Sequence, residues 1–137
     1  MTETIQHQYR FEGISPALIF EAYMDTKSHK AFTQSSCTIS REVNGRSSMY
    51  DGYCHAINLS LNPGKRIEQQ WWAHEDAWPE GHRSRIILEL AESGPDTVLT
   101  FTQEEVPVML SEQIEKGWFT YYWNPLAIFL QSETDES

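Results

Sequence analysis

The chain has 137 residues, a length that suits one hydrophobic core better than two separate domains. Its 5 Trp, 6 Tyr and 6 Phe, within a hydrophobic fraction of 39%, supply enough apolar area for a folded interior and exclude a disordered chain. The formal net charge is −10 and Lys and Arg are scattered, which disfavours nucleic acids and anionic membrane surfaces as partners.

No apolar run approaches the roughly 20 residues of a membrane span, and the polar start MTETIQHQYR is unlike a signal peptide. We therefore expect a cytoplasmic protein. Cys37 and Cys54 fit neither a disulfide framework nor a metal-type spacing, so we expect buried thiols. The histidines show no zinc-type pairing either, and we expect no metal and no cofactor.

The first predicted element is a strand over residues 4–12, because apolar or aromatic side chains alternate with polar ones. Its predicted inner face carries Ile5, His7, Tyr9 and Phe11. A turn leads into a helix with Ser15 as candidate N-cap and Pro16 at the first helical position. A second short helix over about residues 25–32 has Asp25 as its candidate cap.

Residues 36–72 are predicted to form antiparallel strands, separated by turn signals at Asn44-Gly45, Asp51-Gly52 and 62–65. After the second turn, the more apolar face is assigned to the core: Tyr53, His55, Ile57, Leu59 and Leu61. The next strand alternates Ile67, Gln69, Trp71 and Ala73. Two more strands follow over 84–92 and 97–105, and Leu99, Phe101 and Gln103 share one face of the second.

The last predicted element is a long amphipathic helix over about residues 111–131, with Ser111 as candidate cap. Its apolar stripe is Leu110, Ile114, Trp118, Tyr121, Tyr122, Pro125, Leu126 and Phe129. Pro125 lacks a backbone donor and should kink the helix near Tyr121. We therefore predict one domain over residues 1–131 and a polar tail over 132–137.

These elements predict an α+β fold, with a curved antiparallel sheet of about six or seven strands, two short N-terminal helices and a long C-terminal helix. The C-terminal helix must cover the apolar face of the sheet, because no other element can. A twisted sheet wrapped around one helix leaves a space, which is the predicted ligand cavity.

The residues predicted to converge on this cavity combine aromatic rings with a few polar groups. They are His7, Tyr9, His55, Ile57, Gln69, Trp71, Phe101, Gln103, Trp118, Tyr121 and Tyr122. The inward amides Gln69 and Gln103 need partners, either in a network with nearby tyrosines or on a bound molecule. The aromatic stripe can equally be plain core. His7 and His55 are the candidates for general acid–base chemistry, and no nucleophile or phosphate-binding motif appears.

Several segments resemble the C-terminal domain of the activator of the heat-shock protein 90 ATPase and its bacterial stand-alone relatives. They are WWAHEDAWPEGHRSRIILELAE, TVLTFTQEEVP and EKGWFTYYW, preceded by GISPALIFEAYMD, the Asp51-Gly52 turn and NPGKRI. Gly117-Trp118 and residues 78–81 are the most specific parts. The resemblance implies the helix-grip fold of the START-like superfamily of polyketide cyclases and lipid-transfer proteins, whose members bind hydrophobic molecules between sheet and helix, and it suggests a link to the stress response.

The chain departs from that family's pattern in two places. It has Asn44-Gly45 where the family often has paired glycines, and Tyr53-Cys54-His55 where a further glycine is common. The eukaryotic co-chaperone also carries a separate N-terminal domain, for which this length leaves no room. This difference speaks against direct activation of a chaperone.

The leading hypothesis is a noncatalytic domain that binds a small hydrophobic or amphipathic molecule between the sheet and the C-terminal helix. One alternative is a chaperone-interacting module, which the resemblance suggests. Another is a small-molecule cyclase or hydrolase that uses His55 or His7, which requires these imidazoles to lie beside the cavity. The sequence leaves open whether the protein is a monomer or a homodimer.

Overall fold

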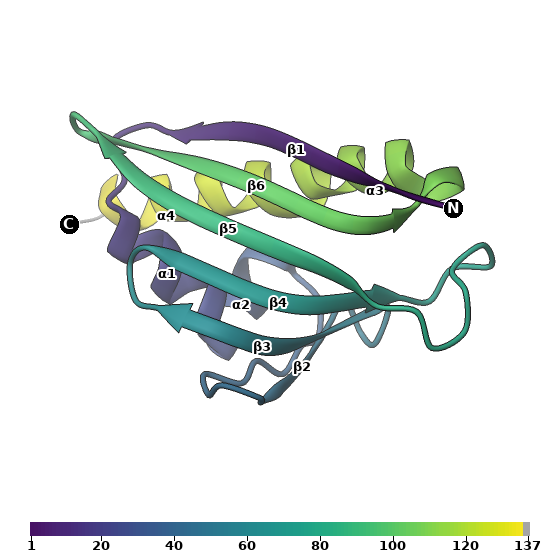
Figure 1. The fold of residues 1–137 in the computed structure, drawn as a ribbon. Coiled ribbons are helices and arrows are strands. Elements are labelled where there is room, and N and C mark those ends of the chain that lie inside the picture. The colour runs from purple at the N-terminus through teal and green to yellow at the C-terminus, as the bar shows by residue number, and fades with distance from the viewer. Residues whose placement is uncertain (136–137) are drawn as a thin grey trace.

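The computed structural model describes residues 1–135 and places all helices on one face of a single sheet (Figure 1). The strands are β1 (Thr2–Phe11), β2 (Arg46–Met49), β3 (Cys54–Asn62), β4 (Arg66–Ala73), β5 (Ser84–Ser93) and β6 (Asp96–Pro107). All neighbours pair antiparallel, in the order β1-β6-β5-β4-β3-β2. The predicted α+β class with a curved antiparallel sheet is confirmed, and the sheet has six strands where about six or seven were predicted. Residues 36–43, which were predicted to begin the run of strands, contribute only the isolated bridge between Thr38 and Ser48.

The helices are α1 (Pro16–Met24), α2 (Thr26–Thr33), η1 (Val108–Leu110), α3 (Ser111–Trp118), η2 (Phe119–Trp123) and α4 (Asn124–Asp135). The last four form the continuous helical run behind β1 and β6 in Figure 1. The N-terminal caps predicted for α1 and α2 are confirmed. The Ser15 hydroxyl accepts from the Leu18 amide at 3.3 Å, and the Asp25 carboxylate accepts from the Ser28 amide at 2.9 Å.

The C-terminal helical run differs from its prediction at both ends. Its cap position is Leu110, and Ser111 is already helical. The Ser111 hydroxyl instead bonds to the Glu3 carboxylate and the Val108 carbonyl, which ties the helix start to β1. Helix α4 continues to Asp135, beyond the predicted end at residue 131, and residues 136–137 of the predicted tail lie outside the described residues.

Asp25→Ala should lower the free energy of unfolding by about 1 kcal/mol, because the Ser28 amide at the start of α2 loses its acceptor. Chemical denaturation of both proteins measures the difference. Asp76→Ala removes an exposed carboxylate from the loop between β4 and β5 and serves as the control. Equal stability of the two variants would show that the Asp25 cap contributes nothing.

Segment η2 is π-helical, and it lies where a kink is predicted. Pro125 has no N–H to donate to the Tyr121 carbonyl four positions earlier, and the Tyr50 hydroxyl donates to that carbonyl at 2.5 Å. A π turn widens the helix and shifts the register of the side chains that follow it. As a result Trp123, which the predicted stripe omits, is fully buried, whereas Tyr121 is 57% exposed.

The inner face of the sheet follows the predicted alternation on β4 and β6. Ile67, Gln69, Trp71 and Ala73 on β4 are buried, as are Leu99, Phe101 and Gln103 on β6. Their side chains meet α1, α2 and the C-terminal helices in one continuous hydrophobic core. The core therefore occupies the layer between the sheet and the helices.

Strand β3 is oriented opposite to its prediction. Cys54, Ala56 and Asn58 are its buried residues, so His55 and Ile57 point to the outer face. The small Ala56 lies directly opposite Trp71 on β4 and leaves room for the indole. A bulge between Asn58 and Ser60 then shifts the register, and Leu61 packs against the core next to its partner Ile67.

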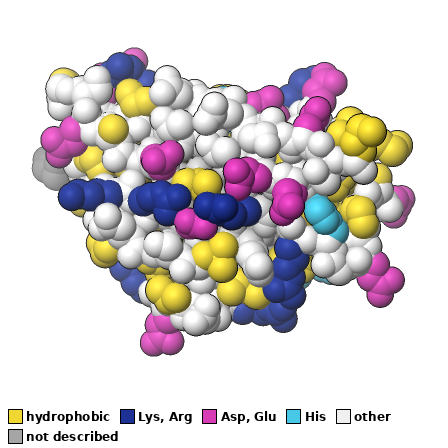
Figure 2. Space-filling view, in the orientation of Figure 1, with side chains coloured by type: hydrophobic (Ala, Val, Ile, Leu, Met, Phe, Trp, Pro, Cys, Tyr) yellow, Lys and Arg dark blue, Asp and Glu magenta, His cyan; other side chains and the backbone are white. Residues whose placement is uncertain are grey.

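The outer face of the sheet carries charged side chains of both signs, which stand among apolar and uncharged side chains in Figure 2. Arg85 bridges Glu68 at 2.7 Å and Glu104 at 3.3 Å. Towards the edge, the Arg83 guanidinium lies 4.3 Å from the ring centroid of Trp72. This mixture of charges keeps the exposed face polar although it carries a tryptophan.

Among residues 1–135, no helix has the length and apolar character needed to cross a membrane.

Candidate functional site

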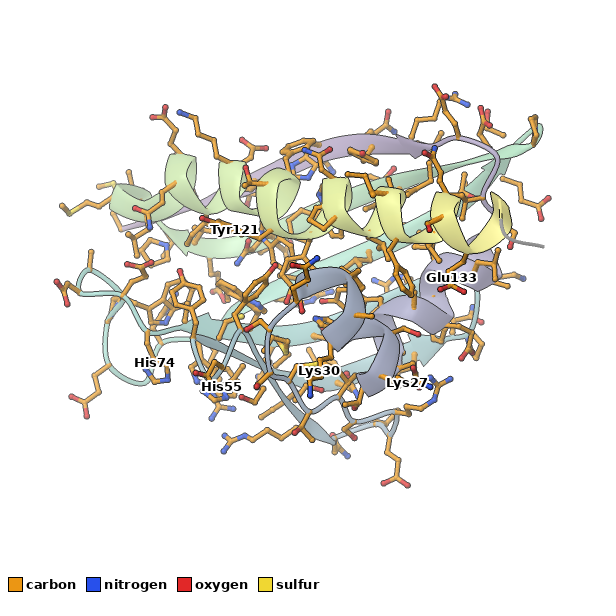
Figure 3. All side chains as sticks on the ribbon, turned by 180° about the vertical axis from the view of Figure 1, so that it is seen from behind. Lys27, Lys30, His55, His74, Tyr121 and Glu133 are labelled. Atoms are coloured by element: carbon orange, nitrogen blue, oxygen red, sulfur yellow. The ribbon has the colours of Figure 1, made fainter. Side chains whose placement is uncertain are left out.

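A cleft of about 480 Å³ opens between the C-terminal helical run and the ends of β3 and β4. It is lined by Tyr50, Tyr53, Cys54, Trp71, Glu75, Gln113, Ile114, Gly117, Trp118, Tyr121 and Tyr122. Figure 3 shows Tyr121 on the helix at the same end of the molecule as His74 and His55, while Glu133 lies at the far end of the helix. The cleft therefore lies at one end of the molecule, between the sheet and the C-terminal helical run.

The floor of the cleft is apolar and aromatic. Cys54 and Trp71 reach it from the sheet, and Ile114, Trp118 and Tyr122 reach it from the helix, all of them buried. The ring centroids of Trp71 and Trp118 are 5.6 Å apart, and those of Trp118 and Tyr122 are 4.9 Å apart. Such contacts fix the rings in place and give the floor a rigid shape.

The indole N–H of Trp71 is buried at this floor and has no acceptor among the described residues apart from the Cys54 sulfur, which accepts weakly. Burial raises the pKa of the Cys54 thiol to about 12, against the opposing effect of nearby Tyr122 and Trp71 donors. The thiol therefore stays protonated at neutral pH and is a poor nucleophile.

The rim of the cleft is polar. The Tyr53 hydroxyl donates to Glu75 Oε1 at 2.6 Å, and Gln113 Nε2 donates to the same oxygen at 3.0 Å. This carboxylate thereby joins the turn before β3 to helix α3. Burial, together with the Glu75 hydrogen bond and charge, raises the pKa of Tyr53, so its phenol is neutral. Gly117 on the helix leaves the opening free of a side chain.

Four of the predicted site residues line the cleft: Trp71, Trp118, Tyr121 and Tyr122. Others that line it were not in the predicted set, namely Tyr50, Tyr53, Cys54, Glu75, Gln113, Ile114 and Gly117. Most of the missed residues lie in turns or at element ends, where strand alternation gives no direction. One signal in the sequence could have indicated the opening of the cleft: Gly117, a glycine within an amphipathic helix and next to Trp118.

The two inward amides are satisfied within the protein and do not line the cleft. Gln69 donates to Asn58 Oδ1 at 2.8 Å and accepts from the Tyr23 hydroxyl at 3.3 Å. Gln103 accepts from the Trp118 indole N–H at 2.8 Å and donates to the Ser84 hydroxyl at 3.0 Å. Phe101 packs beside them in the core. The partners of Gln69 are therefore Asn58 and Tyr23, and those of Gln103 are Trp118 and Ser84.

His7 and Tyr9 are packed along β1, away from the cleft. His7 Nε2 accepts from the Trp123 indole N–H at 2.9 Å, while Nδ1 lies 2.9 Å from a Glu115 oxygen. Its ring also stacks on Phe101, with centroids 5.1 Å apart. The Tyr9 hydroxyl donates to Asn124 at 2.9 Å. These contacts join β1 to the C-terminal helical run.

The placement of His55 and Ile57 on the core side is wrong, because both lie on the outer face of the sheet. The His55 ring stacks on Trp72, with centroids 5.6 Å apart, and its Nε2 lies 3.2 Å from His74 Nε2. Neither His55 nor His7 lines the cleft. The cyclase or hydrolase hypothesis therefore lacks both of its proposed imidazoles at this site.

Comparison with known proteins gives a consistent family assignment. Residues 14–131 match the family described as "Activator of Hsp90 ATPase homolog 1-like protein". A curated relative, the activator of 90 kDa heat shock protein ATPase homolog of Dictyostelium discoideum, is 31% identical over 118 residues. That match covers 85% of this chain but 30% of the relative, so the chain spans about a third of that protein's length.

Two solved structures share the fold. An HSP90 activator from Plasmodium falciparum has a TM-score of 0.85 and 17% identity, with 94% of this chain and 96% of that chain covered. CalU16 from Micromonospora echinospora has a TM-score of 0.76 and 16% identity, with 97% and 79% covered. At these identities the likeness concerns the fold alone.

Proposed function

We propose that this chain, which belongs to the activator of Hsp90 ATPase homolog 1-like family, binds a small amphipathic molecule in the cleft without catalysing a reaction on it. The observation that carries the proposal is the cleft between the sheet and the C-terminal helical run, which combines an aromatic floor with a polar rim.

The size and lining of the cleft support the same proposal. Its volume of about 480 Å³ falls within the range usual for small-molecule pockets, roughly 300–1,000 Å³. An aromatic floor suits an apolar body, and the polar rim around Tyr53, Glu75 and Gln113 suits a hydrated head group. The lining therefore favours an amphipathic ligand over a wholly apolar one.

The chemistry of the lining favours binding over catalysis. Within residues 1–135, Cys54 is the one thiol at the cleft, and its raised pKa of about 12 keeps it protonated. Glu75 already accepts two hydrogen bonds on one oxygen. Neither group is arranged as an activated nucleophile beside a base, and none of the described residues that line the cleft is a histidine.

Gly117→Leu should block the cleft while preserving the fold. An added Cβ would lie 3.7 Å from Tyr121 Cδ2, an ordinary contact, and leucine favours a helix over glycine by roughly 0.5–1 kcal/mol. Octanol, titrated against the labelled protein by NMR, should bind the wild type saturably. In the variant its dissociation constant should rise at least about tenfold, the effect of losing roughly 1.4 kcal/mol of apolar contact.

Ser132→Leu adds the same side chain at an exposed position of α4, far from the cleft, and should leave octanol affinity unchanged. Equal affinity of the wild type and the Gly117 variant would place the octanol outside the cleft. An absence of saturable binding by octanol and by its charged analogues octylammonium and octanoate would remove the proposal.

A second candidate function is interaction with a chaperone, which the names of the family and of the Dictyostelium relative favour. We propose it as the alternative because the chain corresponds to about 30% of that relative. The test is the ATP turnover of a purified Hsp90 with and without the chain in excess. A faster turnover supports this alternative, and an unchanged rate removes it.

A further inference from the structure

We infer that the amphipathic ligand is an amine whose protonated head group lies at the rim of the cleft, beside Glu75. This inference rests on the proposed function and specifies the class of molecule bound. Three features of the lining point to a cation: the charges that line the cleft, the aromatic rings and the position of the carboxylate.

The charge of the lining is negative. Among the residues that line the cleft, Glu75 is acidic and none is Lys or Arg. The nearest cation along the helix, Lys116, is paired with Glu112 at 3.3 Å and belongs to the neighbouring groove. A carboxylate head group would thus meet Glu75 without a compensating cation, whereas an ammonium group would meet an opposite charge.

The aromatic rings at the opening also favour a cation. Tyr50, Tyr53 and Tyr121 surround the rim, and Tyr121 packs edge-on against Tyr50 with centroids 5.7 Å apart. The face of an aromatic ring carries negative charge density and attracts an ammonium ion placed within about 6 Å of its centre. Burial raises the pKa of Tyr50 and Tyr53, so both phenols are neutral at pH 7. Their rings, rather than a phenolate charge, would attract the ammonium group.

The position of Glu75 fixes where the head group lies. Its Oε1 is held by Tyr53 and Gln113, one from each side of the opening, so the carboxylate is oriented before any ligand arrives. The apolar part of an amine bound there would extend over Trp118 towards Trp71. The net charge of −10 also attracts cations and repels anions at long range.

The test compares three probes with the same apolar chain: octylammonium, octanol and octanoate, each titrated by NMR at neutral pH and low salt. We expect octylammonium to bind about fivefold or more tighter than octanol, and octanoate to bind weaker than both. Octylammonium binding no tighter than octanol overturns the inference and leaves the proposed function standing. No saturable binding of any probe overturns both.

Glu75→Gln keeps the oxygen that accepts from Tyr53 and Gln113 but removes the charge. The ratio of the octanol to the octylammonium dissociation constant should shrink at least about threefold in this variant. Glu133→Gln removes a charge at the far end of the C-terminal helix (Figure 3) and should keep the wild-type preference. An unchanged preference in Glu75→Gln would overturn the assignment of Glu75 as the partner of the amine.

Discussion

Trp118→Ala should destabilise the protein by about 3–5 kcal/mol, the usual cost of removing a buried indole. Trp118 is 3% exposed and packs on Phe101, Trp71 and Trp123. Its N–H also satisfies the buried Gln103 carbonyl at 2.8 Å, which the substitution leaves without that donor. This residue joins the helix to the sheet beneath the cleft, so denaturant unfolding should detect the loss directly.

Two further variants separate the contributions to that loss. Trp118→Phe keeps a ring but removes the donor to Gln103, and should cost about 1–3 kcal/mol. Ile128→Ala truncates a side chain on α4 that is 69% exposed, and should change stability by less than about 0.5 kcal/mol. A Trp118→Ala variant as stable as Ile128→Ala would contradict the described core.

Acidification should destabilise the protein through His29, which is 1% exposed. Burial lowers the pKa of His29 from 6.5 to about 4, although the bond from Nδ1–H to the Tyr23 carbonyl favours the charged form. With Nδ1 as donor, Nε2 accepts from the Tyr122 hydroxyl at 3.2 Å. His29 thus holds Tyr122, a residue of the cleft floor, in place from helix α2.

The direction of this pH effect follows from proton binding at His29 in the folded and the unfolded protein. Below pH 6.5 the unfolded chain binds a proton at His29 that the folded protein rejects until about pH 4. Stability is therefore lost progressively between these values, by at most about 3 kcal/mol, and the contribution is constant above pH 6.5. Free energies of unfolding measured from pH 7.5 to pH 4 will show the slope.

His29→Asn should flatten this slope, because no titrating group remains at the site, even though the variant is less stable at neutral pH. Ile128→Ala changes an exposed side chain of α4 that binds no proton, and this control should keep the wild-type slope. A wild-type slope retained in His29→Asn would show that other groups cause the acid sensitivity.

Much of the fold could be predicted because local signals agree with tertiary packing. Ser15 and Asp25 begin helices as their side chains suggest, and strong alternation on β4 and β6 places Gln69 and Gln103 inward. The prediction of the buried face of strand β3 was wrong because the side chains on its two faces differ in size as well as in polarity. The small Ala56 is inside because Trp71 needs the space opposite it, and only the strand register reveals this requirement.

The cleft was harder to predict than the fold. Its aromatic floor includes Trp118 and Tyr122, which the helical periodicity identified. Its rim depends on Tyr53 and Glu75, which come together only when the turn before β3 meets the end of β4. The π turn at η2 also altered which side chains face inward, because it adds a residue within one turn and so buries Trp123.

The proposed binding of an amine in the cleft is tested most directly by the indole N–H signals of Trp71 and Trp72 in an NMR titration with octylammonium. These neighbours face opposite sides of β4, Trp71 towards the cleft and Trp72 towards the outer face beside Arg83. We expect the Trp71 signal to shift saturably and the Trp72 signal to remain in place. A Trp71 signal that does not move while the amine binds elsewhere would contradict the account.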